Sequence, residues 1–329
     1  MASAKIACED HYIDAFDKGI RLHVREKRPR GKRRFTPAET LLLVHGRGPA
    51  APVVFDLPVP GYSWMDRLAS RGYDVFAVSV RGFGYSTYPR EMIDDPVGKP
   101  PAIRGHTAAR DIAAAVRFIR NLREVDKVNI LGRSWGSTTV PTFASAHNPQ
   151  VRKIVLYAPY YAGVNHARAA QFEDPERPGH FNEKLGAWFW TTEADLHRRW
   201  WGHIPGRRHH RWRERHVVRA VWETRLYYSP EGAGRRPSAV KSPNGSYADL
   251  FDRARGIPAY DAAKLRCPAL LIFGDYDGSA NEAEAWDLFG KMTNSRGKRF
   301  VVIGDGTHYM EWEKRREELY REVENFLES

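Results

Sequence analysis

Cysteine is almost absent from this chain of 329 residues, in which only Cys8 and Cys267 occur. Two cysteines make no disulfide framework, so the count fits a reducing compartment. Long apolar runs are also absent, because no stretch approaches the ~18 residues that a helix needs to cross a membrane. Residues 1–10 lack the charged start and the long apolar stretch of a secretory signal. These absences predict a cytoplasmic protein without a membrane partner.

Negative charge is scarce relative to positive charge. The chain has 40 Asp and Glu against 52 Lys and Arg, which gives a formal net charge of +12. A basic balance can indicate nucleic-acid binding. Here the positive charge gathers in residues 25–34 and in the middle third of the chain, and it forms no stripe on a recognisable binding motif. We therefore expect no nucleic-acid partner, and we interpret residues 25–34 as a solvated connection before Leu41.

Short apolar runs alternate with helical patterns along most of the chain. The patterns predict an N-terminal hairpin at 12–25, strands at 41–44, 73–78, 128–131, 151–157, 269–273 and 299–303, and helices at 63–71, 107–123 and 310–328. This alternation predicts a mostly parallel sheet covered by helices on both faces. The alternation of strand and helix patterns is absent between residues 160 and 259, a segment with six tryptophans and seven histidines. Residues 232–245, rich in glycine, proline and serine, are expected to form a mobile loop.

One motif predicts the chemistry. The stretch Gly132-Arg133-Ser134-Trp135-Gly136 reads G-x-S-x-G and directly follows the predicted strand 128–131. In that context it describes a strand, a sharp turn and a helix, and the turn lifts the serine hydroxyl out of the sheet. The glycines are needed because a side chain at either place would clash in so tight a turn.

The partners that such a serine needs follow two later strands. A serine hydroxyl is a poor nucleophile until an imidazole takes its proton, and the imidazole needs a carboxylate to fix its tautomer. His308 follows the strand 299–303, and three aspartates are possible acids: Asp275 and Asp277 after the strand 269–273, and Asp305 after the strand 299–303. The order Ser, Asp, His is that of the α/β-hydrolases.

With these residues in view, the chain resembles a cap-bearing α/β-hydrolase outside roughly 165–255. Leu41-Leu42-Leu43-Val44-His45-Gly46-Arg47-Gly48 resembles the first buried strand and oxyanion loop of that family. Ser79-Val80-Arg81-Gly82-Phe83-Gly84-Tyr85-Ser86 resembles its D-x-R-G-x-G-x-S turn, with Ser79 in place of the aspartate. Residues 134–138, with His147-Asn148-Pro149 after them, are similar to proline iminopeptidases. Those enzymes usually carry H-G-G-P-G where this chain has His45-Gly46-Arg47-Gly48-Pro49.

The resemblance implies an α/β-hydrolase fold with a mostly parallel sheet flanked by helices. It implies a core of residues 1–159 and 260–329, with an inserted, mainly helical cap at 160–259. The family pattern after the seventh strand, a glycine, two residues and then the acid, selects Asp277 over Asp275 and Asp305. It also implies that the backbone N–H groups of Arg47 and Trp135 hold the oxyanion.

The substrate-binding residues are less defined by pattern. The side chains of Arg47 and Arg133 flank the proposed site, so they are candidates to bind a carboxylate or phosphate of the substrate. The alternative is that they point outward or pair with core acids such as Asp111. Most of the six tryptophans are expected to pack the core of the cap, with Trp188 and Trp190 as the candidates for substrate contact.

We expect neither a metal nor a cofactor. The spacing of the cap histidines matches no H-E-x-x-H or paired-cysteine site, and a solvated basic helix face accounts for them better. These histidines are His203, His209, His210 and His216. Gly82 and Gly84 form no dinucleotide fingerprint, because the third glycine and the acidic residue that follows are both wrong for one.

The sequence therefore predicts a serine hydrolase that cleaves an ester, thioester or lactone of a small molecule through an acyl-enzyme. Haloalkane dehalogenases and epoxide hydrolases share the fold but use an aspartate at the nucleophile turn, and Ser134 argues against both. An aminopeptidase of the proline iminopeptidase kind is one alternative, and it would need cap carboxylates to receive an ammonium group. The candidates are Glu173, Glu183, Glu193 and Glu223. A carbon–carbon bond hydrolase and a non-catalytic small-molecule receptor are further alternatives.

Overall fold

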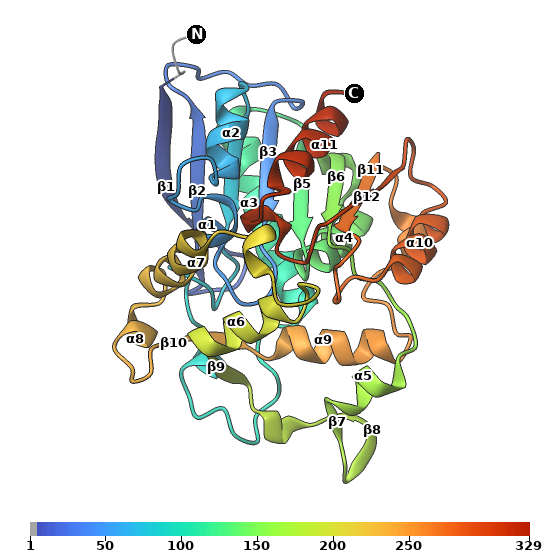
Figure 1. The fold of residues 1–329 in the computed structure, drawn as a ribbon. Helices are drawn as coiled ribbons and strands as arrows, with labels where there is room; N and C mark the ends of the chain where they lie inside the picture. Colours follow the sequence, from blue (N-terminus) through green and yellow to red (C-terminus); the bar gives the residue numbers. More distant parts are fainter. Residues whose placement is uncertain (1–4) are drawn as a thin grey trace.

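An eight-stranded sheet forms the centre of the molecule, of which the computed structural model describes residues 5–329 (Figure 1). The strands follow one another across the sheet in the order β1-β2-β4-β3-β5-β6-β11-β12. They are β1 (Ile6–Asp14), β2 (Arg21–Pro29), β3 (Thr40–Val44), β4 (Asp74–Val78), β5 (Val128–Arg133), β6 (Val151–Tyr157), β11 (Ala269–Gly274) and β12 (Arg299–Ile303).

Six strands of this sheet are parallel. The ladder runs from β4 through β3, β5, β6 and β11 to β12, whereas β1 pairs antiparallel with β2 and β2 pairs antiparallel with β4. Every residue of β3, β4, β5 and β11 is buried, as the strands of a parallel sheet covered on both faces must be. The predicted α/β fold is confirmed, and the carboxyl ends of all six strands meet at one edge.

Helices cover both faces of the sheet. They are α1 (Ala51–Phe55), α2 (Trp64–Ser70), α3 (Gly105–Arg123), α4 (Gly136–Ala146), α10 (Glu282–Lys291) and α11 (Arg316–Glu328). Because successive strand residues point to opposite faces, Leu41 and Leu43 join one apolar cluster and Leu42 and Val44 another. The first cluster contains most of the buried apolar side chains of α2 and α11, and the second contains most of those of α3 and α4.

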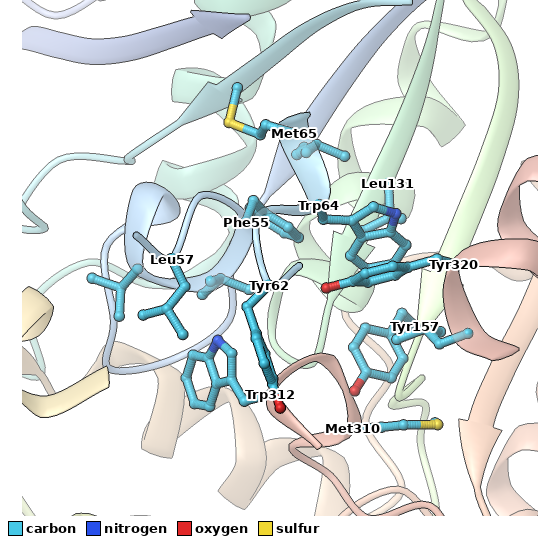
Figure 2. Close-up of a cluster of buried hydrophobic side chains, with 14 of the residues drawn as sticks. Phe55, Leu57, Tyr62, Trp64, Met65, Leu131, Tyr157, Met310, Trp312 and Tyr320 are labelled. Atoms are coloured by element: carbon cyan, nitrogen blue, oxygen red, sulfur yellow. The ribbon is translucent and has the colours of Figure 1, made fainter. Parts of the chain in front are cut away.

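Aromatic contacts join α2 to α11 in the first cluster. Figure 2 shows the indole of Trp64 lying against the phenol of Tyr320, and the two ring centroids are 4.5 Å apart in a stacked arrangement. Such a pair adds about 0.5–1.5 kcal/mol beyond the area that it buries. The C-terminal helix is thereby held on the sheet beside the strands that carry the predicted acid and base.

The cap segment, residues 160–259, lies beyond the carboxyl ends of the strands (Figure 1). Its helices are α5 (His166–Ala170), α6 (Glu193–Trp201), α7 (Arg215–Tyr227), α8 (Pro230–Ala233) and α9 (Gly245–Ala254), and its strands are β7 (Glu173–Asp174), β8 (Arg177–Phe181), β9 (Trp188–Thr192) and β10 (Ala239–Pro243). Leu196 and Trp200 of α6, with Val217 and Val221 of α7, belong to the first apolar cluster. The division of the chain at residues 160 and 259 stays a prediction.

The predicted mobile loop at 232–245 is wrong. Residues 239–243 form strand β10, which pairs antiparallel with β9 and is buried along its whole length. The glycine-rich start of this segment also packs closely, since a Cβ on Gly232 would lie 1.6 Å from the carbonyl oxygen of Ala239. Glycine here allows a close backbone approach rather than mobility.

The basic stretch after the N-terminal hairpin also differs from prediction. Residues 25–29 belong to β2 instead of forming a solvated connection, and residues 25–27 pair with β4. Arg25 and Lys27 have an acidic partner, because Asp56 lies 3.0 Å and 2.5 Å from their charged nitrogens. Ion pairing removes the reason to keep these side chains in water, so the charge run can belong to a strand.

The C-terminal segment is not one helix from residue 310. A 3₁₀ turn covers Met310–Trp312, and α11 begins only at Arg316. The other 3₁₀ turns are Arg90–Met92, Asn148–Gln150, Glu183–Leu185, His209–Arg211 and Ala262–Lys264. Among residues 5–329, no helix has both the length and the apolar character needed to cross a bilayer.

Candidate active site

The turn between β5 and α4 holds Ser134 in a strained backbone conformation. Its φ is +57°, a value that side-chain-bearing residues rarely adopt. The flanking glycines explain how the turn closes: a Cβ on Gly132 would lie 2.2 Å from the carbonyl oxygen of Gly136, and one on Gly136 would lie 2.6 Å from that of Val44. The backbone N–H of Ser134 donates to the carbonyl of Tyr157 at 2.8 Å. The predicted strand, sharp turn and helix are all present.

The structure brings Ser134, His308 and Asp277 together at the carboxyl edge of the sheet. The Nε2 of His308 lies 2.9 Å from Oγ of Ser134. On the other side of the ring, Nδ1 lies 2.9 Å and 2.8 Å from the two carboxylate oxygens of Asp277. All three residues are buried, with 4–7% of their surface exposed. The arrangement allows a proton to pass from the hydroxyl to an imidazole held in one tautomer.

The second candidate acid lies elsewhere. Asp275 is exposed, and its Oδ1 accepts the N–H of Gly306 at 3.2 Å. Asp277 instead accepts the backbone N–H groups of Ser279 and Ala280 at 2.8 Å and 2.9 Å, in addition to the imidazole. These three donors fix the Asp277 carboxylate in the turn after β11, so its position relative to His308 is defined.

Burial and charge determine the protonation of this group. Burial lowers the pKa of His308 below its ordinary 6.5; Asp277 opposes that change, and the positive charge of Arg133 adds to it. Burial raises the pKa of Asp277, but the charge and hydrogen bond of His308 outweigh this and leave that pKa below 3.8. At neutral pH the imidazole is therefore neutral and able to accept a proton, while the carboxylate is ionised.

Arg133 anchors the loop that carries His308. Its Nη2 donates to the carbonyl oxygen of His308 at 2.7 Å and lies 2.9 Å from Oε1 of Glu311. The other oxygen of Glu311 accepts the hydroxyl of Tyr157 at 2.6 Å. The predicted alternative partner, Asp111, is occupied by Arg81. Arg133 lies beside the site as predicted, but its charge is used within the protein.

The loop after β3 lies directly against Ser134. A Cβ on Gly46 would lie 2.8 Å from the Cβ of Ser134, so the next residue, Arg47, is beside the hydroxyl. Among residues 5–329, no protein group accepts a hydrogen bond from the backbone N–H of Arg47 or of Trp135. Both amides remain available to a negatively charged oxygen.

His45 connects this loop to the backbone of its neighbours through both ring nitrogens. Its Nε2 accepts the N–H of Val80 at 3.1 Å, and its Nδ1 donates to the carbonyl of Gly46 at 2.7 Å. Burial lowers the pKa of His45 to about 4, so the ring is neutral. Ser79, at the start of the turn at residues 79–86, accepts the N–H of Ala51 at 3.1 Å through its Oγ. The turn at residues 79–86 and the oxyanion loop are thereby connected.

Two cavities open at Ser134. The larger one, the arginine cavity, has a volume of about 430 Å³, and its lining includes Ser134, His308, Arg47, Arg199 and Arg225. The smaller one, the tyrosine cavity, has a volume of about 50 Å³ and is also lined by Ser134 and Arg47. Its aromatic walls are Trp135, Tyr160, Tyr161 and Tyr260. A substrate at the hydroxyl would face a cationic space on one side and, on the other, a narrow space whose walls are mainly aromatic but also include Asp249 and Arg253.

The two tryptophans singled out from the sequence are not in these cavities. Trp188 and Trp190 line neither the arginine cavity nor the tyrosine cavity. Pairing of β9 with β10 brings Lys241 beside them, and its Nζ lies 4.2 Å and 5.3 Å from the two ring centroids. The Nε1 of Trp188 donates to the carbonyl of Asp94 at 3.0 Å. The structure thus gives no contact that supports substrate binding by this pair.

His203 is a neighbour of the site that the sequence did not identify. Its ring stacks on that of His308 with centroids 5.6 Å apart, and its Nδ1 accepts the N–H of Gly278 at 2.9 Å. Burial lowers the pKa of His203 to about 4. The prediction of a solvated helix face is therefore wrong for this histidine, whereas His210 and His216 are exposed. No local pattern distinguishes His203, because its partners come from other parts of the chain.

Comparisons with known proteins agree with this architecture. The family model described as "alpha/beta hydrolase fold" matches residues 39–315. Epoxide hydrolase 3 from Xenopus tropicalis is 30% identical over 152 residues, which are 45% of this chain and 34% of that protein. The chain thus aligns with only about a third of the length of this curated relative.

Solved structures share the fold at low sequence identity. An enol-lactonase from Burkholderia xenovorans superposes with a TM-score of 0.62 at 17% identity, covering 97% of this chain and 100% of that one. An esterase from Thermogutta terrifontis superposes with a TM-score of 0.62 at 17% identity, covering 97% of this chain and 98% of that one. E-2-(acetamidomethylene)succinate hydrolase superposes with a TM-score of 0.65 at 18% identity, covering 98% of this chain and 100% of that one. Together with the family match and the parallel sheet, these findings show that the chain belongs to the α/β-hydrolase fold family.

Proposed function

We propose that this protein is a serine hydrolase that cleaves an ester, thioester or lactone of a small molecule through an acyl-enzyme. One observation carries the proposal: the unbroken line from the Ser134 hydroxyl through His308 to Asp277, with separations of 2.9 Å and 2.8 Å. The strained φ of Ser134 and the unpaired amides of Arg47 and Trp135 support it.

The proposed reaction begins at Ser134. Its Oγ attacks the acyl carbon while its proton passes to Nε2 of His308. The carbonyl oxygen becomes negatively charged and accepts the N–H groups of Arg47 and Trp135, each worth about 3–4 kcal/mol of transition-state stabilisation. His308 then gives its proton to the leaving alkoxide or thiolate, which leaves an acyl group on Ser134. A water molecule then attacks the acyl carbon while His308 takes its proton. The proton passes to Oγ of Ser134 as the bond between Ser134 and the acyl group breaks, and the free acid departs.

The aminopeptidase alternative finds little support. It requires carboxylates that receive a substrate ammonium, but neither cavity at Ser134 is lined by any of the four predicted glutamates, Glu173, Glu183, Glu193 and Glu223. The arginine cavity would repel an ammonium group. Turnover of proline 4-nitroanilide would favour the aminopeptidase over the esterase.

The similarity to epoxide hydrolase 3 suggests another reaction of the same fold. Epoxide hydrolases use an aspartate at the nucleophile turn, and this chain has Ser134 there. A serine in this place favours acyl transfer over opening of an epoxide.

Labelling with a fluorophosphonate tests the proposal directly and needs no knowledge of the substrate. We expect wild-type protein to be labelled and the Ser134→Ala variant to remain unlabelled. Ser70→Ala, which alters an exposed serine at the end of α2, serves as the control and should be labelled like wild type. Absence of labelling in folded wild-type protein would favour the non-catalytic receptor.

A matched pair of aspartate variants tests the role of the acid. Asp277→Asn should lower the turnover of a 4-nitrophenyl ester by about 10⁴-fold, because the amide stabilises the wrong tautomer of the imidazole. Asp275→Asn removes an exposed carboxylate that does not touch His308, so turnover should stay close to wild type. The opposite ranking of the two variants would contradict the assignment of Asp277.

A further inference from the structure

The arginine cavity contains more positive charge than the protein itself neutralises. Arg47 comes from the loop after β3, Arg168 from α5, Arg199 from α6 and Arg225 from α7, and all four line the cavity. Among residues 5–329, no Asp or Glu carboxylate lies within 4.0 Å of any of these four guanidinium groups. Arg133, which lines the same cavity, differs because Glu311 neutralises it.

Arg225 is the most informative member of this group. It is 95% buried, with 5% of its surface exposed, and its Nε has no hydrogen-bond partner in the part of the chain that the structure describes. Its Nη2 would lie 3.4 Å from a Cβ on Gly48, which places the guanidinium beside the oxyanion loop. Buried charges in proteins are normally paired, because an unpaired one costs several kcal/mol in lost hydration. An ion that neutralises Arg225 is therefore expected from outside the chain.

The charges around Arg225 also favour a bound anion. Burial lowers the pKa of Arg225 to about 10, and the charges of Arg199 and Arg133 contribute to this decrease. The guanidinium of Arg47 lies 4.0 Å from the ring centroid of Tyr247, so its plane is held against an aromatic face. An anion bound between guanidinium groups that repel one another relieves this repulsion and accepts strong charge-assisted hydrogen bonds from them.

We propose that Arg47, Arg199 and Arg225 form a binding site for an anionic oxygen group, a carboxylate or a phosphate, carried by the substrate whose acyl carbon meets Ser134. This proposal rests on the proposed serine hydrolase activity and names the class of substrate. The cavity volume of about 430 Å³ suits a small metabolite rather than a polymer. The tyrosine cavity on the other side of Ser134, with its volume of about 50 Å³, then receives only a small part of the same molecule.

Two esters of nearly equal shape test the site. Monomethyl glutarate carries a carboxylate at the end of its acyl chain, and methyl 5-methylhexanoate has an isopropyl group in that place. We measure kcat/KM for both by titrating the released acid at constant pH. Wild-type protein should prefer the anionic ester. In Arg225→Met and in Arg199→Met, kcat/KM for the anionic ester should fall about 10- to 100-fold more than for the neutral ester, the loss of one or two charge-assisted hydrogen bonds.

The control is a surface arginine of the same helix. Arg219 lies on α7, is exposed and pairs with Glu223 at 2.7 Å. Arg219→Met should leave kcat/KM unchanged for both the anionic and the neutral ester. Arg225→Lys keeps the positive charge and should restore part of the preference for the anionic ester, which separates a charge effect from a disturbance of the fold.

A binding measurement that needs no turnover distinguishes the two anions. In the Ser134→Ala protein, we compare the melting temperature in sodium glutarate and in sodium phosphate with that in sodium chloride of the same ionic strength. A rise with glutarate alone supports a carboxylate, and a rise with phosphate supports a phosphate. The same salt should have no effect once Arg225→Met is added to that protein.

The outcomes separate this proposal from the proposed reaction. If kcat/KM falls equally for both esters in the arginine variants while fluorophosphonate labelling is intact, the proposed anion site is wrong and the proposed serine hydrolase activity is unaffected. The absence of any specific salt effect in Ser134→Ala protein would overturn it as well. Failure of labelling in wild-type protein would instead contradict the reaction.

Discussion

At the scale of single residues, the chemistry depends on where a few charges are placed around one imidazole. Asp277 raises the proton affinity of His308, while burial and Arg133 lower it, and the lowering prevails. A histidine in this state is a base at neutral pH without first losing a proton. Arg133, paired with Glu311, donates to the backbone carbonyl of His308. It therefore helps to position the imidazole in addition to lowering its pKa.

The pH dependence of activity follows from this balance. The base must be neutral to accept the Ser134 proton, so kcat/KM on a neutral ester should fall as the pH decreases through the pKa of His308. Because that pKa lies below 6.5, more than half of the maximal kcat/KM should remain at pH 6.5, and the midpoint of the loss should lie at lower pH. A pH–rate profile checks this expectation. A midpoint at or above pH 6.5 would contradict a lowered pKa.

At the scale of elements, the turn between β5 and α4 combines strain with close packing. The strand, the helix and the oxyanion loop approach one another so closely that Gly132 and Gly136 have no room for a side chain. A strained residue persists only where the surrounding structure determines its conformation. Here the hydrogen bond from Ser134 N–H to the carbonyl of Tyr157 and the packing of both glycines provide that support.

Two glycine substitutions separate packing from intrinsic helix propensity. Gly132→Ala places a methyl group 2.2 Å from a backbone oxygen, so we expect a loss of about 1–3 kcal/mol or more in the free energy of unfolding. Gly290, near the end of α10, has nothing within 4 Å of its Cβ position. Gly290→Ala should therefore stabilise the protein by about 0.5–1 kcal/mol. Urea unfolding measures both, and equal stability of the two variants would contradict the close approach at the turn.

At the scale of the whole molecule, a buried carboxylate connects the cap segment to the core beside the site. Oε1 of Glu313 accepts the indole N–H of Trp200 on α6 at 2.7 Å and the hydroxyl of Thr307 at 2.6 Å. Thr307 directly precedes His308, so this carboxylate joins α6 to the loop of the proposed base. Burial raises the pKa of Glu313 to about 7, despite the opposing hydrogen bonds of Thr307 and Trp200.

This raised pKa predicts how stability changes with pH. The folded state binds the Glu313 proton more tightly than the unfolded state, whose pKa is about 4.5, so this residue makes the free energy of unfolding decrease as the pH rises from 4.5 to 7. A difference of about 2.5 pKa units corresponds to roughly 3 kcal/mol. Glu313→Gln cannot titrate, so its stability relative to wild type should improve by up to about 3 kcal/mol between pH 5 and pH 8.

Chemical unfolding of both proteins across this pH range provides the measurement. Glu318→Gln, which alters a partly exposed pair with Arg315, should follow the wild-type curve within about 0.5 kcal/mol. Parallel curves for wild type and Glu313→Gln would contradict the raised pKa.

Sequence alone determined those features that depend on residues close together along the chain. The apolar runs predicted the parallel strands, and G-x-S-x-G predicted the turn at Ser134, because periodicity and turn chemistry act over a few residues. The order of Ser134, Asp277 and His308 also indicated which strand ends should meet. Their catalytic roles remain proposals, but their convergence follows from the parallel sheet.

Tertiary structure alone decided what fills the space above that edge. Strand β10 forms because β9 pairs with it, although its own residues suggested a loop. The partner of Arg133 is Glu311, and the neighbour of His308 is His203, which no local spacing reveals. The charge of Arg225 became informative only when its burial and lack of an acidic partner were seen. Such properties arise from segments far apart in the chain, because packing determines which charges meet and which remain unpaired.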